Sequence, residues 1–178
     1  MANGESLEKL GILIMGLNGC GKSTLGRALA DRLHCRFMDA EDFFFPAGQS
    51  NPYAVSRTRE EALALLRAET ARHTRFVYAS VSGPRDGEVE ARCALAVVLS
   101  APKDVRLNRV KAREAARFGA RILPGGDMYA QQEAFHAFVA RRSEDDVEAH
   151  VARLSCPVLR LDATRPIEEN VAIIAGFC

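Results

Sequence analysis

Apolar residues gather along the chain in short continuous runs that are separated by longer segments of helical composition. The runs are short enough to be strands that are buried on both faces. They predict five strands, at residues 11–16, 35–40, 75–83, 94–102 and 156–163. The segments between them predict helices at residues 22–34, 59–73, 103–118, 128–153 and 166–177. The helix over 128–153 is amphipathic, with Phe135, Phe138 and Val139 on one side.

Strands that alternate with helices indicate a parallel sheet that is covered by helices on both faces. We therefore predict an α/β fold, a three-layer α/β/α sandwich around a five-stranded parallel sheet. A chain of 178 residues suits one domain, here residues 1–178, and is short for two. Ligands of such sheets bind beyond the carboxyl ends of the strands. These ends bring together residues 16–24, 39–42, 80–86, 100–103 and 162–166.

The stretch GLNGCGKST, residues 16–24, lies between the first predicted strand and the first predicted helix. Gly16, Gly21, Lys22 and Ser23 match the spacing G-x-x-x-x-G-K-[ST] of a phosphate-binding loop. Glycines let the backbone N–H groups wrap around an anion, and the following helix turns the positive end of its dipole toward it. The stretch therefore predicts that the protein binds a nucleoside triphosphate.

We expect ATP to lie on this loop, with Lys22 at the β- and γ-phosphates and the Ser23 hydroxyl as a ligand of Mg²⁺. The other loop residues that we assign to ATP binding are Asn18, Gly19, Cys20 and Thr24.

Three acids follow the second predicted strand, at Asp39, Glu41 and Asp42. Carboxylates beside a triphosphate repel it unless a cation lies between them. Asp39 is therefore a candidate for holding Mg²⁺, while Glu41 or Asp42 orients an acceptor hydroxyl or accepts its proton. The alternative is that these acids cap the next helix, because Asp is favoured at helix starts.

Five arginines recur at helical spacing, and they are Arg106, Arg109, Arg113, Arg117 and Arg121. Like charges at this spacing repel one another, so an anion on this face would offset the repulsion. We assign Arg109 and Arg113 to phosphate binding, and Arg142 is a further candidate for the transferring phosphoryl group. For Arg106 and Arg117 a solvated helix face is the alternative.

The third predicted strand ends without the Asp that many phosphate-loop enzymes place there, which leaves the metal to Ser23 and Asp39. Ser80 and Ser82 at this end either contact the transferred group or are plain strand residues. Arg57 and Arg59 either bind an anionic acceptor or belong to the start of the next helix.

Lysine and arginine number 24 against 23 acidic residues, a net charge of +1. This balance argues against a nucleic-acid or membrane partner. The charged first residues, MANGESLEKL, show no signal peptide, and no apolar run is long enough for a membrane helix, so we expect a cytosolic protein. The five cysteines show no C-x-x-C spacing and are expected to be reduced.

The stretch GLNGCGKSTLGRALADRLHCRFMDAED resembles the opening of the shikimate and gluconate kinases, phosphate-loop kinases with the fold of nucleoside monophosphate kinases. The resemblance implies ATP and Mg²⁺ as cofactors. It places Phe37, Asp39 and Glu41 on a segment that serves the metal and the acceptor. The triple glycine that those families carry after the third strand is replaced here by Ser80-Val81-Ser82-Gly83.

Further segments carry the resemblance toward the end of the chain. The segment RLNRVKAR resembles the helix that leads into the mobile lid of these kinases, which implies ATP contacts for Arg109 and Arg113 and a lid at about residues 117–130. RSEDD resembles the segment that carries an arginine to the phosphates, here Arg142. LDATRPIEENV resembles the loop that borders adenine and implies that Thr164 and Arg165 lie near the base.

We therefore expect a phosphotransferase that moves the γ-phosphoryl of Mg·ATP to a hydroxyl of a small acceptor bound within about residues 43–75. A nucleoside or nucleotide kinase is an alternative of the same class. An ATP-binding switch or ATPase without a small acceptor is an alternative of another class. The sequence does not identify the acceptor. It is compatible with a monomer and with a homodimer.

Overall fold

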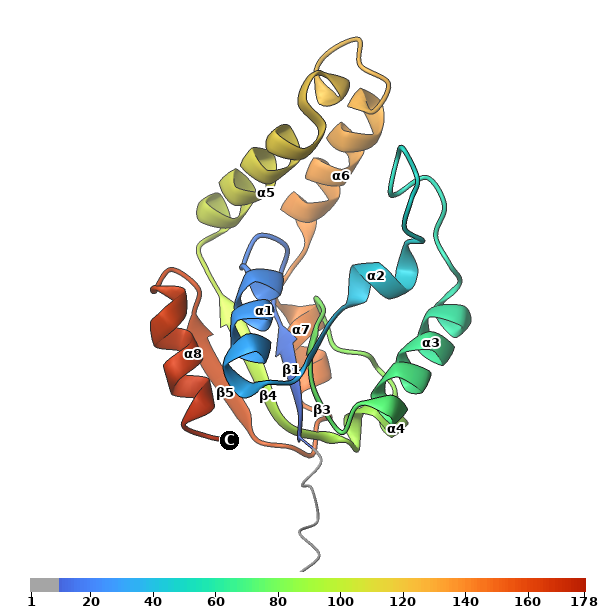
Figure 1. Ribbon diagram of the computed structural model, residues 1–178. Helices are drawn as coiled ribbons and strands as arrows, with labels where there is room; N and C mark the ends of the chain where they lie inside the picture. The colour runs from blue at the N-terminus through green and yellow to red at the C-terminus, as the bar shows by residue number, and fades with distance from the viewer. Residues whose placement is uncertain (1–9) are drawn as a thin grey trace, which may run out of the picture.

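The structure is a computed structural model that describes residues 10–178, and it contains a parallel sheet of five strands (Figure 1). The strands are β1 (Leu10–Met15), β2 (Arg36–Asp39), β3 (Arg75–Ala79), β4 (Cys93–Ser100) and β5 (Val158–Asp162). They lie in the order β2-β3-β1-β4-β5, and each neighbouring pair is parallel. The predicted sheet is confirmed. The expectation about a signal peptide concerns residues that, apart from Leu10, lie outside the described part.

Helices cover both faces of this sheet. On one face lie α1 (Lys22–Leu33) and α8 (Ile167–Ala175). On the other face lie α3 (Arg59–Arg72), the short α4 (Gly87–Glu90) and α7 (Asp145–Val151). The three-layer α/β/α arrangement is therefore present as predicted.

Two further helices project beyond the carboxyl edge of the sheet (Figure 1). They are α5 (Lys103–Phe118) and α6 (Tyr129–Arg141), and the short 3₁₀ helix η1 (Gly119–Ile122) follows directly after α5. The tip of this hairpin falls within the predicted lid. The short helix α2 (Ala40–Phe44) follows β2 at the same edge.

The central strand β1 shows why the sheet needs helices on both sides. Ile12 and Ile14 pack with α1 and α8, whereas Leu13 and Met15 pack with the helices of the opposite face. All four side chains are 0% exposed. Because successive side chains of a strand point to opposite faces, a continuous apolar run is what a doubly covered strand requires.

The prediction of one long helix over residues 128–153 is wrong, because the chain forms α6 and α7 with a break between them. Arg142 is extended, with φ −62° and ψ 135°. The backbone N–H of Asp145 then donates to the Ser143 hydroxyl oxygen at 3.2 Å, where the second helix begins. Serine competes for backbone groups in this way and favours a new helix start over continuation.

The predicted strand over 75–83 is shorter than expected, since β3 ends at Ala79. The N–H of Ser80 still donates to the carbonyl oxygen of Ile14 at 3.0 Å, but Gly83 then turns the chain with a φ of 74°. The segment after β2 also differs, because residues 40–44 form a helix. Among residues 10–178, no helix has the length and apolar character to cross a membrane.

Replacing Leu29 by alanine should destabilise the protein strongly. Leu29 is 0% exposed and packs in the core between α1 and the sheet, so its removal leaves a cavity. We expect a loss of about 2–5 kcal/mol in the free energy of unfolding, measured by denaturant titration. Leu65→Ala is the control, because Leu65 is 44% exposed and should cost well under half as much. Equal losses in the two variants would contradict this description of the core.

Candidate active site

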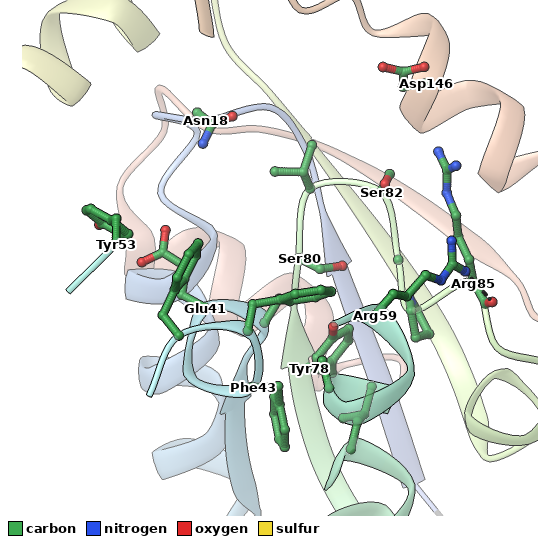
Figure 2. A pocket seen from close by; sticks show the side chains of 18 of the residues that line it. Asn18, Glu41, Phe43, Tyr53, Arg59, Tyr78, Ser80, Ser82, Arg85 and Asp146 are labelled. Carbon is green, nitrogen blue, oxygen red and sulfur yellow. Dashed lines mark hydrogen bonds between the residues drawn. The ribbon is translucent and has the colours of Figure 1, made fainter. Parts of the chain in front are cut away.

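Two cavities open at the carboxyl edge of the sheet and share one wall. The first, of about 830 Å³, is bordered by the phosphate loop and we call it the nucleotide cavity. The second, of about 730 Å³, lies against α2, α3 and α6 and we call it the acceptor cavity (Figure 2). Five residues line both cavities, and they are Asn18, Ala40, Glu41, Ser80 and Val81. A group bound in one cavity can therefore meet a group bound in the other.

The phosphate loop directly follows β1 and wraps against α5. Gly19 has a φ of 85°, and a Cβ atom at this position would lie 2.3 Å from the carbonyl oxygen of Arg106. Only glycine fits such a close approach with a left-handed backbone. Gly21 is the N-cap of α1, so the N-terminus of this helix faces the cavity that an anion would enter.

Lys22 is held toward the loop before any phosphate binds. Its Nζ donates to the carbonyl oxygen of Leu17 at 3.2 Å. Burial lowers the pKa of Lys22 to about 8, although the nearby Asp39 and Glu41 act in the opposite direction. A half-buried ammonium group that bonds only to a backbone carbonyl oxygen in the described part of the chain is well prepared to bind phosphate.

Ser23 and Asp39 form a direct link between the phosphate loop and β2. The Ser23 hydroxyl donates to Asp39 Oδ2 at 2.5 Å. Asp39 also caps α2, since its Oδ1 accepts the N–H of Glu41 at 3.1 Å. The two interpretations of Asp39 are thus compatible, because each uses a different oxygen.

The donor set at Ser23 and Asp39 fits magnesium. Mg²⁺ prefers oxygen ligands and usually keeps several waters while it takes one or two from the protein and others from phosphates. The described residues contain no cluster of three or more His, Cys, Asp or Glu side chains that would hold a metal without such a nucleotide.

The two other acids after β2 differ in position. Glu41 lines both cavities, whereas Asp42 lines only the nucleotide cavity. Burial raises the pKa of Glu41, and the charge of Asp39 raises it further. The pKa of Asp42 is raised by the same two causes. Of the two, only Glu41 lies where it can contact groups from both sides.

The five regularly spaced arginines of α5 and η1 take different positions. Arg109, Arg113 and Arg117 line the nucleotide cavity. Arg106 is only 4% exposed and donates to the carbonyl oxygens of Ala101 and Asn18, so the solvated face is the wrong interpretation for it. Arg121 instead pairs with Asp127 at 2.7 Å, at the tip of the hairpin.

Glu114 explains how these arginines lie close together. This carboxylate is 0% exposed, and its Oε1 lies 2.7 Å from Arg113 Nη2. Arg109 is held by the carbonyl oxygen of Ala163, to which it donates at 3.1 Å and 3.2 Å. One buried acid and one carbonyl thus orient two guanidinium groups toward the same cavity.

The acceptor cavity has aromatic walls and a few polar groups. The aromatic lining residues are Phe43, Phe44, Phe45, Tyr53, Tyr78, Phe135 and Phe138. Ser80 and Ser82 also line it, as do Arg59, Arg85 and Arg142. Arg142 Nη1 donates to Asn18 Oδ1 at 3.0 Å, which connects the arginine of this cavity to the phosphate loop.

Three predicted site residues lie elsewhere. Arg57 donates to the carbonyl oxygens of Asp42 and Phe43 and lines neither cavity. Thr164 bonds to Asp162, while its neighbour Arg165 lines the nucleotide cavity. Gly16 donates its N–H to Val81 and shapes the end of β1. The contacts of Arg57 and Gly16 are thus to backbone carbonyl oxygens, whereas that of Thr164 is to the carboxylate of Asp162.

Sequence reasoning did not assign Arg85 to the site. Its position in the predicted rim segment 80–86 is a signal that could have identified it. The sequence pattern also gives no sign that Phe135 and Phe138 line the acceptor cavity, because their helix faces this cavity only after the chain has folded.

The hairpin of α5 and α6 touches the loop between α2 and α3. Arg117 Nη1 donates to the Tyr53 hydroxyl at 2.9 Å, and Arg121 Nη1 donates to the carbonyl oxygen of Ser50 at 2.7 Å. A third bond joins Asn51 to Gln131. The lid region and the acceptor loop are therefore linked before any ligand is bound.

Comparisons with known proteins agree with this geometry. A family model described as shikimate kinase matches residues 18–72, which include the phosphate loop from Asn18 onward, the three acids and α3. The uncharacterized protein YqaC of Bacillus subtilis is 29% identical over 177 residues, 95% of this chain and 97% of that protein. Shikimate kinase 2 of Escherichia fergusonii is 34% identical over 113 residues, 57% of this chain and 60% of that enzyme.

A solved structure extends the comparison to the whole fold. The crystal structure of a gluconokinase from Sinorhizobium meliloti has a TM-score of 0.52 at 16% identity, and the match covers 95% of both chains. The chain is a phosphate-loop kinase similar to the shikimate and gluconate kinases. Such a kinase uses ATP, typically with Mg²⁺, and acts on a small molecule.

The pKa of Lys22 gives this kinase a testable pH dependence. The ammonium form binds phosphate; with a pKa of about 8 it predominates at lower pH and is lost as the pH rises through about 8. We therefore expect the affinity for Mg·ADP to fall between pH 7 and pH 9.5, measured by calorimetric titration. In Lys22→Arg this fall should disappear, because arginine stays charged. Lys111→Arg, at an exposed position on α5, is the control and should behave as the wild type.

An affinity of the wild type that stays constant up to pH 9.5 would contradict a neutralisable Lys22 at the phosphates. A fall in the affinity for Mg·ADP that persists unchanged in Lys22→Arg would contradict it as well.

Proposed function

We propose that this kinase transfers the γ-phosphoryl group of Mg·ATP to a hydroxyl of a small molecule bound in the acceptor cavity. The observation that carries the proposal is the wall of Asn18, Glu41 and Ser80 that the two cavities share. A phosphoryl group on the loop side of this wall faces an acceptor on the other side. Direct transfer requires that the phosphoryl group and the acceptor lie next to each other.

Lys22 and the arginines of α5 would bind the triphosphate. Lys22 lies at the N-terminus of α1, while Arg109 and Arg113 reach the same cavity from α5. Their positive charges oppose the charge that spreads over the phosphoryl oxygens in the transition state. Ser23 and Asp39 would hold Mg²⁺, which neutralises phosphate charge when bound. Arg165 lies beside Ala163 on the same cavity and would border the base.

Glu41 is our candidate for orienting the acceptor hydroxyl and receiving its proton. It borders both cavities, and burial raises its pKa toward the range in which a carboxylate accepts protons effectively. Asp42 is the weaker candidate because it does not line the acceptor cavity. Asp39 is already used by Ser23 and by the cap of α2.

Arg142 would contact the phosphoryl group as it passes between the cavities. It lines the acceptor cavity, lies over the ring of Phe138 at 4.9 Å and bonds to Asn18. The break between α6 and α7 is what brings it there, since Arg142 directly follows the last residue of α6 and is extended. A charged group placed at this wall stabilises the transferred group without lying on the triphosphate itself.

Closure of the hairpin tip would exclude water. Water is itself an acceptor, so a kinase that stays open hydrolyses ATP. The bonds of Arg117 and Arg121 to the loop after α2 provide a route by which acceptor binding and lid position affect each other.

The aromatic walls favour a second candidate acceptor, a nucleoside or nucleotide. Phe43, Phe45 and Tyr53 lie on the segment after β2, and Phe135 faces them from α6. Planar bases stack on such side chains. A cavity of about 730 Å³ is large enough for a ligand of this size.

The test is the release of ADP from Mg·ATP across a panel of sugar acids, cyclic hydroxy acids, nucleosides and nucleoside monophosphates. One class should raise the rate strongly above the rate without acceptor. Lys22→Met and Asp39→Asn should each lower kcat by about 100-fold or more, since each removes a charge at the reacting phosphates.

Two variants serve as controls for these substitutions. Lys111→Met and Asp31→Asn make the same chemical changes at exposed positions outside both cavities and should keep wild-type rates. If Mg·ATP binds but no acceptor of the panel raises the rate of ADP release, the transfer reaction is refuted and an ATP-dependent switch is favoured instead. Equal losses in the exposed variants would show that the site substitutions act by unfolding.

A further inference from the structure

The chain between β3 and α4 forms one wall of the acceptor cavity. All residues from 80 to 85 line this cavity, and Figure 2 shows Ser80, Ser82 and Arg85 along the wall. The backbone N–H groups of Ser82, Gly83 and Arg85 form no hydrogen bond with any of the described residues. The middle of segment 80–85 is therefore not held by bonds from its own N–H groups.

The segment is anchored near both of its ends. The N–H of Ser80 donates to the carbonyl oxygen of Ile14, in the central strand, at 3.0 Å. At the other end, Asp86 Oδ1 accepts the N–H of Val89 at 3.1 Å, and Asp86 Oδ2 accepts a bond from Arg67. The shape of the residues between these anchors therefore depends largely on what packs against them.

His150 of α7 packs directly against the middle of the segment. The residue is 2% exposed. Gly83 has a φ of 74°, and a Cβ atom at this position would lie 2.3 Å from His150 Nε2. This contact leaves no room for a side chain on the segment. The imidazole ring thus supports one wall of the acceptor cavity from below.

The imidazole ring of His150 has no hydrogen bond of its own. Within the described residues neither ring nitrogen has a hydrogen-bond partner, although Nε2 lies 3.3 Å from Glu90 Oε1. This oxygen is already used, because it accepts the N–H of Asp86 at 3.1 Å. Buried polar side chains are nearly always hydrogen-bonded, so an unpaired imidazole calls for an explanation.

The charged groups around His150 come from three parts of the chain. Glu90 belongs to α4, Arg85 to segment 80–85, and Arg153 follows α7, while Asp146 lies one turn earlier on α7. Burial lowers the pKa of His150; Glu90 acts in the opposite direction, and Arg85 and Arg153 lower it further. The ring is therefore neutral near pH 7. A proton on it would add a buried positive charge beside two arginines.

We propose that the neutral imidazole of His150 holds the middle of segment 80–85 in the shape that binds the acceptor, and that protonation of the ring releases it. His150 is then a positioning residue, since it acts through Gly83 and lines neither cavity. A charged ring would turn toward water to complete its hydrogen bonds, and the backbone packed on it would move. This inference rests on the proposed function, because it assigns the same cavity to the acceptor.

The sign of the pH dependence follows from the lowered pKa. The ordinary value for imidazole is about 6.5, and a base whose pKa is lower in the folded protein stabilises the native arrangement above that pH. This contribution is lost as the pH falls below about 6.5. We therefore expect the affinity for the acceptor to fall in the same direction.

The first test needs no acceptor. NMR spectra of protein saturated with Mg·ADP follow the His150 ring and the backbone amides of Ser82 and Gly83 from pH 7.5 to pH 5. We expect a neutral ring at pH 7 and amide signals that move with the same midpoint as the ring. In His150→Gln this movement should disappear. His73→Gln is the control, because His73 lies 3.5 Å from Glu69 but its side chain is 42% exposed, and it should behave as the wild type.

Two further variants change the charges around the ring without touching it. Glu90→Gln should move the midpoint of His150 to lower pH, because it removes the charge that favours the protonated ring. Arg153→Gln should move it to higher pH, because it removes a charge that opposes protonation. The amide signals of Gly83 should follow the ring in both variants. A purely structural role of His150 would not produce these opposite shifts.

The second test uses the acceptor that raises ADP release most in the panel described above. His150→Gln should raise its KM about tenfold at pH 7.5, while kcat stays within about twofold, because the ring shapes the cavity without contacting the reacting groups. The KM of the wild type should rise as the pH falls below about 6.5, and this rise should be smaller in His150→Gln.

Four results would overturn the proposal. They are a ring that is charged at pH 7, a ring that stays neutral until the protein unfolds, amide signals of Ser82 and Gly83 that do not follow the ring, and a KM that is the same in His150→Gln and the wild type. An unchanged affinity for Mg·ADP shows that a variant is folded. If His150→Gln does not fold, Glu90→Gln and Arg153→Gln decide by the direction of their shifts.

Failure of this inference and failure of the proposed function give different patterns. If His150 does not position the segment but transfer occurs, an acceptor still raises ADP release and its KM does not depend on His150. If transfer is absent but the ring controls the segment, the amide signals follow the ring and no acceptor raises ADP release.

Discussion

The central strand β1 is buried on both faces, and this constraint determines where everything else in the site lies. Because β3 and β4 pair with it in parallel on either side, the carboxyl ends of the neighbouring strands come to the same edge. The phosphate loop that leaves β1 therefore lies between the segments that leave the other strands. The two cavities and their shared wall follow from this order.

The site concentrates positive charge, and the fold contains specific means of holding it. Glu114 is completely buried beside Arg113, and Arg106 is buried against the carbonyl oxygens of Ala101 and Asn18. These contacts allow α5 to pack on the phosphate loop in spite of its many arginines. In the acceptor cavity Arg59 donates to the carbonyl oxygen of Arg85, and within the described residues neither of these two arginines has an acidic partner within 4.0 Å.

The segments that differ from prediction lie next to the acceptor cavity. Helical periodicity runs without interruption from residue 128 to 153, so it could not indicate the break at Ser143 that places Arg142 at the wall. The strand composition of residues 75–83 likewise gave no sign of the turn at Gly83, whose backbone packs against the imidazole of His150. Arg57 is predicted as a residue that binds the acceptor, but its guanidinium group donates to backbone carbonyl oxygens of α2 instead.

The sequence by itself determined the class of fold, the phosphate loop and the acids after β2, because these depend on local patterns of apolar residues and on fixed spacing over a few positions. The tertiary structure alone decided which arginines face the nucleotide, which support the loop and which reach the acceptor. These roles depend on contacts between residues far apart in the chain, such as Arg142 with Asn18 and Arg59 with Arg85. A guanidinium group is long and flexible, so its partner is chosen by the packed neighbours around it rather than by its place in the sequence.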